Sequence, residues 1–350
     1  MVDIAVAHNT TPFVTVYPWT TGVGFGAKYA NPATLPANNG TGVAFSPSGN
    51  DIAVAHVYSP YVTAYPWTTG VGFGAKYTNP VTLPPGTGYG VAFSPSGNDI
   101  AVAHYTTPFI TAYPWTSGVG FGIKYANPAT LPTNYGLGVA FSPSGNDIAV
   151  VHLTSPRISV YPWTSGVGFG LKYTNPVTLP TGDVLGVAFS SSGNDIAVGH
   201  DGSPFITAYP WTSGVGFGIK YANPVTLPPS AGFGVAFSPS GNDIAVTNTY
   251  YSPRINVYPW TTGVGFGAKY TNPVTLPLGT GLGVAFSPSG NDIAVAHSTT
   301  PFITTYPWTS GVGFGIKYAD PATLPTGTGN GVAFTSGVVV IGIPAPWFKM

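Results

Sequence analysis

The chain has 350 residues, and ten lysines and arginines balance ten aspartates, so its formal net charge is zero. Only 6% of the residues are charged, against about 25% in an average soluble domain. We therefore expect no nucleic-acid binding, because no basic stripe could neutralise phosphates; the lack of cysteine excludes disulfides, and no apolar run reaches the ~20 residues of a membrane span.

A unit of 48 residues recurs along the whole chain. The word GVAF opens seven copies, and one interval is 49 because the loop 247–252 carries an extra residue. The copies begin at Gly42, Gly90, Gly138, Gly186, Gly234, Gly283 and Gly331. A fixed period of this length is typical of solenoids, arrays and propellers.

Each copy contains four β-branched and aromatic runs separated by clusters of Pro, Gly, Ser and Asn. In the copy that starts at Gly90 they predict strands over residues 90–94, 98–104, 108–116 and 119–126. Such a pattern predicts a four-stranded antiparallel meander. Nothing in the copy predicts a helix.

Large and small side chains alternate along these strands. On the second strand the large face holds Ile100, Val102 and His104, and the small face holds Asp99, Ala101 and Ala103. The fourth strand has Phe121, Ile123 and Tyr125 on its large face and Gly120, Gly122 and Lys124 on the other. Successive side chains on a strand point to opposite faces. The pattern therefore favours sheets stacked face to face, as in a radial ring.

The run FSPSGNDIAVAH, followed by an Ile/Val strand that ends in an aromatic residue, resembles the WD40-type propeller repeat and its FSPDG-containing relatives. YPWT stands where that family has its Trp-Asp dipeptide, so the family's hydrogen-bond network is not carried over. The resemblance covers nearly the whole chain. It implies an all-β, seven-bladed β-propeller of four-stranded antiparallel blades around a channel, with the first strand of each blade innermost.

The two ends of the chain complete one blade. The N-terminus begins at a second strand, Val2–His8, and residues 331–334 supply a first strand. Pairing between them would close the ring and remove its exposed edges. We therefore assign residues 1–334 to the propeller and residues 335–350 to an apolar C-terminal tail. The segment 338–343 is expected either to fold back on its own disc or to add a strand to a partner.

Repeated motifs that suggest chemistry have structural explanations. GVGFGIK lacks the Gly-Lys-Ser/Thr ending of a phosphate-binding loop and lies within a predicted strand. The aspartate that recurs in each copy is expected to accept hydrogen bonds from backbone N–H groups of its turn. The recurring lysine is expected to lie beside a tyrosine. One repeat position holds a histidine in six copies and Asn248 in the seventh, which predicts hydrogen bonding rather than metal binding. The histidines are His8, His56, His104, His152, His200 and His297.

The copies differ mainly in two loops, one after NDIAVAH and one before GVAF. In an up-and-down blade both loops lie on the same side of the disc, which we call the variable face; the SPSGN and WTSG or WTTG turns form the uniform face. Loops rich in Tyr, Asn, Ser and Gly are typical of recognition surfaces, although drift after duplication would also vary them. The candidate binding residues are Tyr58, Tyr89, Tyr105, Tyr135, Leu153, Arg157, Asp201, Phe233, Tyr250, Tyr251 and Arg254.

We expect a non-enzymatic recognition or assembly module that binds a protein or a glycan through the variable face. A multivalent lectin is the first alternative and a lactonase-like propeller enzyme the second. No catalytic residue, metal or cofactor is expected, because no acid pair or nucleophile stands out. Self-association into an oligomer fits the low charge. The location stays open: the chain begins inside a repeat with no room for a signal peptide, and a phage virion or tail, or release outside the cell, would suit it.

Overall fold

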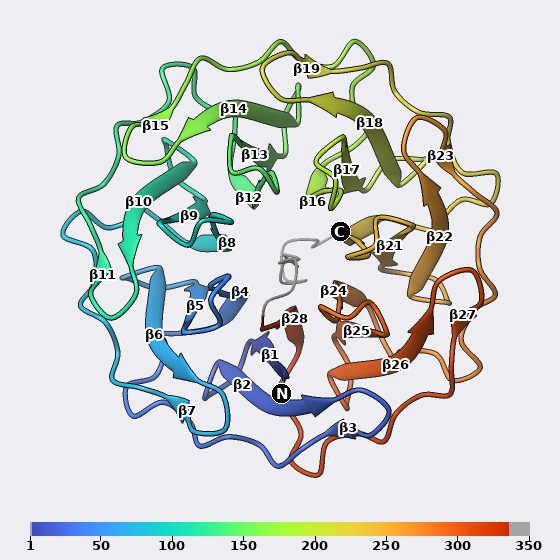
Figure 1. Cartoon of the computed structure of the whole chain (residues 1–350), viewed down its shortest axis with the longest axis horizontal. Helices are drawn as coiled ribbons and strands as arrows, with labels where there is room; N and C mark the ends of the chain where they lie inside the picture. The colour runs from blue at the N-terminus through green and yellow to red at the C-terminus, as the bar shows by residue number, and fades with distance from the viewer. Residues whose placement is uncertain (1, 336–350) are drawn as a thin grey trace.

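The computed structural model describes residues 2–335, which form seven sheets arranged as a ring around a central axis (Figure 1). Each sheet has four strands, paired antiparallel, and no helix occurs in the described part of the chain. The all-β, seven-bladed propeller is thus confirmed. A membrane-spanning helix is absent from residues 2–335. Of the tail predicted for residues 335–350, all but Thr335 lies outside the described residues.

We number the blades from the N-terminus, so blade 1 contains the second strand at the start of the chain. The first strands, in blades 2 to 7 and then blade 1, are β4 (Gly40–Phe45), β8 (Gly88–Phe93), β12 (Gly136–Phe141), β16 (Val184–Phe189), β20 (Gly232–Phe237), β24 (Gly281–Phe286) and β28 (Gly329–Phe334). The second strands, from blade 1, are β1 (Val2–His8), β5 (Asp51–His56), β9 (Asp99–His104), β13 (Asp147–His152), β17 (Asp195–His200), β21 (Asp243–Asn248) and β25 (Asp292–His297). The third strands are β2 (Val14–Thr20), β6 (Val62–Thr68), β10 (Ile110–Thr116), β14 (Ile158–Thr164), β18 (Ile206–Thr212), β22 (Ile255–Thr261) and β26 (Ile303–Thr309). The fourth strands are β3 (Gly24–Phe25), β7 (Gly72–Phe73), β11 (Gly120–Phe121), β15 (Gly168–Phe169), β19 (Gly216–Phe217), β23 (Gly265–Phe266) and β27 (Gly313–Phe314).

The fourth strand is much shorter than predicted. Only β11 (Gly120–Phe121) of the predicted residues 119–126 pairs with the third strand. The pairing of the two strands stops there because the next residue on the third strand is Pro114, which has no N–H to donate to the fourth strand. Beyond it Ile123 is 88% exposed, so its predicted place on a packed face is wrong.

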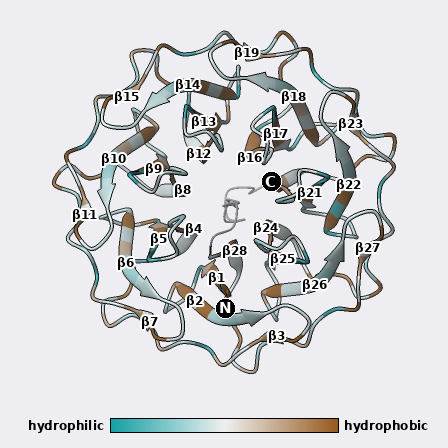
Figure 2. Ribbon diagram, in the orientation of Figure 1, coloured by the Kyte–Doolittle hydropathy of each residue, from teal (hydrophilic) through white to brown (hydrophobic). Residues whose placement is uncertain are grey.

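The large face of each blade packs on the small face of the blade before it, as predicted for the second strand. In one such interface Ile100, Val102 and Trp115 of blade 3 contact Ala53 and Ala55 of blade 2. The same arrangement recurs around the ring. Figure 2 shows hydrophobic colour at the start of every third strand, where these interfaces lie. Burying each large apolar side chain contributes about 1.5–3 kcal/mol.

The ring closes through the two ends of the chain, as predicted. Strand β28 pairs antiparallel with β1, with Ile4 opposite Phe334 and Ala7 opposite Gly331. Beyond the strand, the Asp3 N–H donates to Thr335 Oγ1 at 2.8 Å, and the Thr335 N–H donates to the Asp3 carbonyl at 2.9 Å. One sheet therefore joins the first and last described residues of the chain.

The repeated aspartate does not have the predicted role in its turn. In blade 2 the serine Ser46 caps the turn, accepting the Asp51 N–H at 3.1 Å. The Asp51 carboxylate is fully buried and instead accepts hydrogen bonds from Tyr77 Oη at 2.6 Å and from Trp115 Nε1 at 3.2 Å. Because Trp115 belongs to blade 3, the aspartate joins two blades. The repeated lysine does lie beside tyrosine, and Lys28 Nζ donates to the Tyr29 carbonyl at 3.1 Å.

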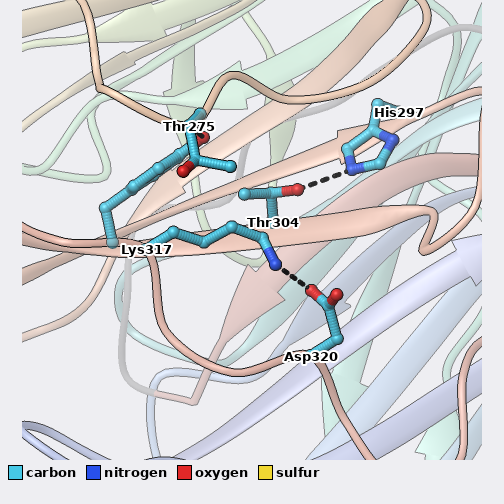
Figure 3. A network of polar contacts seen from close by, with 6 residues as sticks. Thr275, His297, Thr304, Lys317 and Asp320 are labelled. Atoms are coloured by element: carbon cyan, nitrogen blue, oxygen red, sulfur yellow. Dashed lines mark hydrogen bonds and ion pairs between the residues drawn. The ribbon is translucent and has the colours of Figure 1, made fainter.

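The repeated histidine has the predicted hydrogen-bonding role. Figure 3 shows His297 Nε2 in contact with Thr304 Oγ1, a distance of 2.8 Å. Burial lowers the pKa of His297 to about 4, so its ring is neutral at pH 7. In blade 6 the pair is replaced by two asparagines, with Asn256 Nδ2 donating to Asn248 Oδ1 at 2.8 Å. The replacement preserves a buried polar contact between the second and third strands.

Candidate functional site

A backbone hydrogen bond ties the two variable loops of a blade together. In blade 7 the Ser298 N–H donates to the Thr280 carbonyl at 3.0 Å, and in blade 3 the Tyr105 N–H donates to the Thr87 carbonyl at 2.9 Å. Two residues that are 18 positions apart in the sequence are thereby held side by side on the variable face. Blade 5 places two aspartates in this position.

Asp183 and Asp201 are the pair in blade 5. The Asp201 N–H donates to the Asp183 carbonyl at 3.0 Å, and the Asp183 N–H donates to Asp201 Oδ1 at 2.6 Å. The loop accommodates this contact because residue 182 is glycine: a Cβ there would lie 2.1 Å from Asp201 Oδ1. Blade 7 has the same geometry without charge, since the Thr280 N–H donates to Ser298 Oγ at 2.9 Å.

The electrostatic environment of this pair differs from that of every other blade. Burial, and then the charge of Asp201, raise the pKa of the Asp183 carboxyl, while Arg157 of blade 4 acts in the opposite direction. Arg157 stands where five of the blades have Phe or Tyr, and its Nη1 donates to the Pro180 carbonyl at 3.2 Å. Two carboxyl groups and a guanidinium thus meet between blades 4 and 5.

His200 lies at the base of the same loop but does not add charge to it. Its Nε2 is 2.9 Å from Thr207 Oγ1. Burial lowers its pKa to about 4, and the charge of Arg157 contributes in the same direction. The ring is therefore neutral at pH 7, and its role is to join the second and third strands.

A surface cavity of about 350 Å³ lies beside Asp201, between blades 5 and 6. Asp201 is the one charged residue in its lining, which otherwise consists of Phe205, Pro229, Ser230, Ala231, Phe233, Tyr250 and Tyr251. The blade 6 loop carries the extra residue of the 49-residue interval and presents two consecutive tyrosines. The Tyr250 N–H donates to Ser230 Oγ at 3.1 Å, which fixes one side of the opening.

The structure brings part of the predicted binding set together. Asp201, Phe233, Tyr250 and Tyr251 line this cavity. Arg157 lies near the aspartate pair, and Arg254 Nη1 donates to the Thr249 carbonyl in the blade 6 loop.

Other members of the predicted set lie elsewhere. Tyr105 stacks on Tyr135, with ring centroids 3.9 Å apart and planes 20° apart. The half-buried Leu153 packs with Tyr135 against an apolar cluster at the axis. Tyr58 lies on blade 2 and is 62% exposed, away from the cavity. These residues form no single site with Asp201.

Two of the predicted residues have almost fully buried side chains, although Phe233 still forms part of the cavity wall. Tyr89 and Phe233 are each 2% exposed. They directly precede the GVAF glycine on first strands, and first strands converge on the axis of a propeller. Their side chains fill that end of the channel together with leucines from three other blades, so their assignment as exposed loop residues is corrected. This apolar plug consists of Tyr89, Leu137, Leu185, Phe233 and Leu282.

The predicted set omitted Asp183, Phe205 and Ser230. Asp183 was recognisable as one of the few charges outside the repeat pattern. Its pairing with Asp201 follows from the backbone bond between the loops, which requires a structure. Phe205 carries no sequence signal, because four of the copies have Phe at this position. Ser230 is the one serine at its repeat position, but its contact with the Tyr250 N–H requires a structure.

The arrangement provides the parts of an acid–base site. A carboxylate lines a cavity with an apolar wall, and its neighbour has a raised pKa, as carboxyl groups in active sites often do. Among residues 2–335, no group of three or more His, Cys, Asp or Glu side chains could hold a metal ion.

Comparisons with known proteins give no sequence family. No family model matches the chain, and no curated protein sequence matches it. The fold is similar to that of the periplasmic gluconolactonase of Pseudomonas aeruginosa, with a TM-score of 0.72 and 14% identity over 98% of this chain and 100% of the other. A protein of Bacteroides fragilis, named as a candidate 6-phosphogluconolactonase, has a TM-score of 0.72 and 14% identity over 95% and 97% of the two chains. The β-propeller domain of Swd1 from Myceliophteria thermophila has a TM-score of 0.58 and 13% identity over 87% and 97%.

These comparisons overturn the expectation of a non-enzymatic recognition or assembly module. Several of the similar structures are named as lactonases, and their TM-scores exceed that of the Swd1 domain. The prediction that the chain is not an enzyme is corrected accordingly, and the virion and lectin settings receive no support. At this identity the likeness establishes the seven-bladed fold alone, and it does not establish a WD40-type family.

Proposed function

We propose that the chain is a lactonase-like hydrolase that opens a sugar lactone at the cavity beside Asp201. The observation that carries the proposal is the position of Asp201, the one charged residue in the cavity lining, whose Oδ1 is held by the Asp183 N–H at 2.6 Å. The likeness in fold to proteins named as lactonases supports the reaction class. No other blade has two carboxyl groups at this pair of positions.

Asp201 acts as the general base in this proposal. Its carboxylate accepts a proton from a water molecule while the water oxygen forms a bond to the lactone carbonyl carbon. The tetrahedral intermediate then collapses, the bond between that carbon and the ring oxygen breaks, and the proton on Asp201 passes to the ring oxygen. The products are a hydroxyl group and a carboxylic acid in one open chain. Such proton transfer typically accelerates a reaction by about 10²–10⁴-fold.

Asp183 is a positioning residue for Asp201. Its N–H orients Asp201 Oδ1, and its own carboxyl has a raised pKa, which favours the uncharged form next to a second carboxylate. Arg157 limits this effect because its charge lowers the same pKa.

The remaining lining suits the substrate class. Tyr250 and Tyr251 are 62% and 65% exposed and form an aromatic wall against which the C–H face of a sugar ring can pack. The Ser230 hydroxyl provides a polar contact at the base of that wall. An apolar wall with few polar groups is typical of small-molecule sites.

Titration of acid release from gluconolactone at constant pH tests the proposal. We expect the wild-type chain to open the lactone faster than buffer does, and D201N to lose about 10²-fold in kcat/KM. The matched control is D320N, which removes an aspartate that pairs with Lys317 at the surface. A wild-type rate equal to that of buffer across neutral and phosphorylated sugar lactones would contradict the proposal.

We also infer that the repeat is a relative of the WD40 type. The support is the FSPSG turn in five of the seven copies and the matching order of strands within a blade. The buried aspartate that joins two blades in this chain would then stand in place of the WD40 hydrogen-bond network.

A further inference from the structure

The central channel contains a second cavity, at the uniform face and on the opposite side of the disc from Asp201. Its volume is about 360 Å³. Phe45, Phe93, Phe141 and Phe189, the last residues of four first strands, line it together with prolines from the SPSGN turns, and no charged residue does. At the variable face the apolar plug fills the channel, so the cavity opens toward the uniform face.

The described chain ends at the same end of the channel as this cavity. Phe334 ends β28, as Phe45 ends β4, and it occupies the same repeat position as the phenylalanines of the lining. Thr335 occupies the position of Ser46, and its hydroxyl accepts the Asp3 N–H just as Ser46 Oγ accepts the Asp51 N–H. The last described residue, Thr335, therefore lies in the ring of turns at the uniform end of the channel.

The sequence beyond Thr335 matches the chemistry of the cavity. From residue 336 to residue 348 it reads SGVVVIGIPAPWF, and its first charge is Lys349. Exposing apolar surface to water costs about 25 cal/mol for each Å² that could be buried. At about 360 Å³ the cavity is at the lower end of the usual range of ligand pockets, so it has room for a few side chains.

We propose that the segment 338–348 is the ligand of this cavity and inserts apolar side chains into the uniform end of its own channel. A covalent tether of a few residues gives such a segment an effective concentration on the order of millimolar. A second copy of the chain at micromolar concentration would compete poorly. The proposal concerns the face opposite the candidate active site and is independent of the proposed reaction.

Crosslinking between introduced thiols tests this, because the chain has no cysteine of its own. V340C is combined with S191C, which lies in the cavity lining in blade 5. The control combines V340C with N291C, an exposed turn residue of blade 7 on the same face. Blade 7 is adjacent to blade 1, so residue 291 is closer to the point where the segment begins. A short bis-maleimide, which tolerates differences in register, is added to dilute protein.

We expect an intramolecular crosslink whose yield with S191C is several-fold higher than with N291C. A yield with N291C that equals or exceeds the yield with S191C would overturn the proposal, because an undocked segment favours the closer thiol. Crosslinked dimers in place of monomers would also overturn it and would identify a second copy as the occupant. Truncation after residue 337 provides an independent measurement. It should lower Tm and increase the fluorescence of a bound hydrophobic dye, and unchanged values of both would contradict docking.

Discussion

Trp67 Nε1 of blade 2 donates a hydrogen bond to Asp3 Oδ2 of blade 1, at a distance of 2.9 Å. The carboxylate is fully buried and also accepts hydrogen bonds from Tyr29 Oη at 2.7 Å and from Thr69 Oγ1 at 2.5 Å. Equivalent Trp–Asp contacts cross all the other blade interfaces. A buried carboxylate that accepts from Trp67 and Thr69 of blade 2 and from Tyr29 of blade 1 thus links the two blades.

Replacing this aspartate tests how much the link stabilises the ring. In D3A the buried Trp67 N–H and the half-buried Tyr29 hydroxyl lose their acceptor, whereas the exposed Thr69 hydroxyl can bind water. Each unsatisfied buried group costs about 1–3 kcal/mol, so we expect a loss of about 2 kcal/mol or more in the free energy of unfolding. The measurement is the urea midpoint at constant m-value. D320A is the control and should change stability by less than about 1 kcal/mol, because its ion pair is at the surface. Equal effects of the two variants would argue against the link.

The buried histidines predict a loss of stability in mild acid. Burial lowers the pKa of each of the six to about 4, whereas the unfolded value is about 6.5. Between these values the unfolded chain binds protons that the folded chain does not. The histidines therefore do not reduce the free energy of unfolding above about pH 6.5. As the pH drops from there toward 4, the free energy of unfolding falls by up to about 1.4 kcal/mol per pH unit for each histidine.

A variant that copies blade 6 into blade 7 provides the control for this pH dependence. H297N/T304N replaces one histidine pair by the asparagine pair that blade 6 already has. We expect the slope of unfolding free energy against pH between 4 and 6.5 to decrease by about one sixth, the share of one histidine among six. A slope that does not change would assign the acid sensitivity to other groups.

Closure of the ring depends on the last strand. Deleting residues 331–350 removes most of β28 and leaves β1 with an unpaired edge, which is a template for aggregation. Truncation after Thr335 is the control, since it retains the pairing of Ile4 with Phe334. We expect the shorter chain to aggregate in light scattering and the longer one to remain monodisperse. Monomeric behaviour of both would show that closure is dispensable.

The tyrosine wall should affect substrate binding more than the chemical step. In Y251A the cavity loses an aromatic contact worth about 1 kcal/mol, which corresponds to an increase of about fivefold in KM with kcat unchanged. Y58A removes an equally exposed tyrosine from blade 2 and should leave both constants unchanged. A decrease in kcat with constant KM would place Tyr251 in the chemical step.

Much of the fold could be predicted from the sequence because each copy repeats the same local pattern. The period, the alternation of Ile100 and Val102 with alanines, and the half-blades at the two ends determine the ring and its closure. The length of the fourth strand was not predictable from alternation, because Pro114 ends the ladder on the partner strand.

The site could be predicted only in part. Asp201 and Tyr251 stood out as departures from the repeat, and the cavity brings them together. The pairing of Asp183 with Asp201 was not predictable, because it depends on a backbone bond between two loops that share no sequence signal. The first strand was expected to be innermost, but the predicted strand began at residue 90, whereas β8 begins at Gly88 and carries Tyr89 into the buried cluster at the axis.

Conversion of the blade 5 pair into the blade 7 pair is the most direct test of the proposed active site. D183T/D201S replaces two carboxyl groups by the hydroxyl-bearing residues that make the same loop contacts in blade 7. We predict an unchanged Tm and a loss of about 10²-fold or more in kcat/KM for gluconolactone hydrolysis. Hydrolysis at the wild-type rate by the folded double variant would contradict the account.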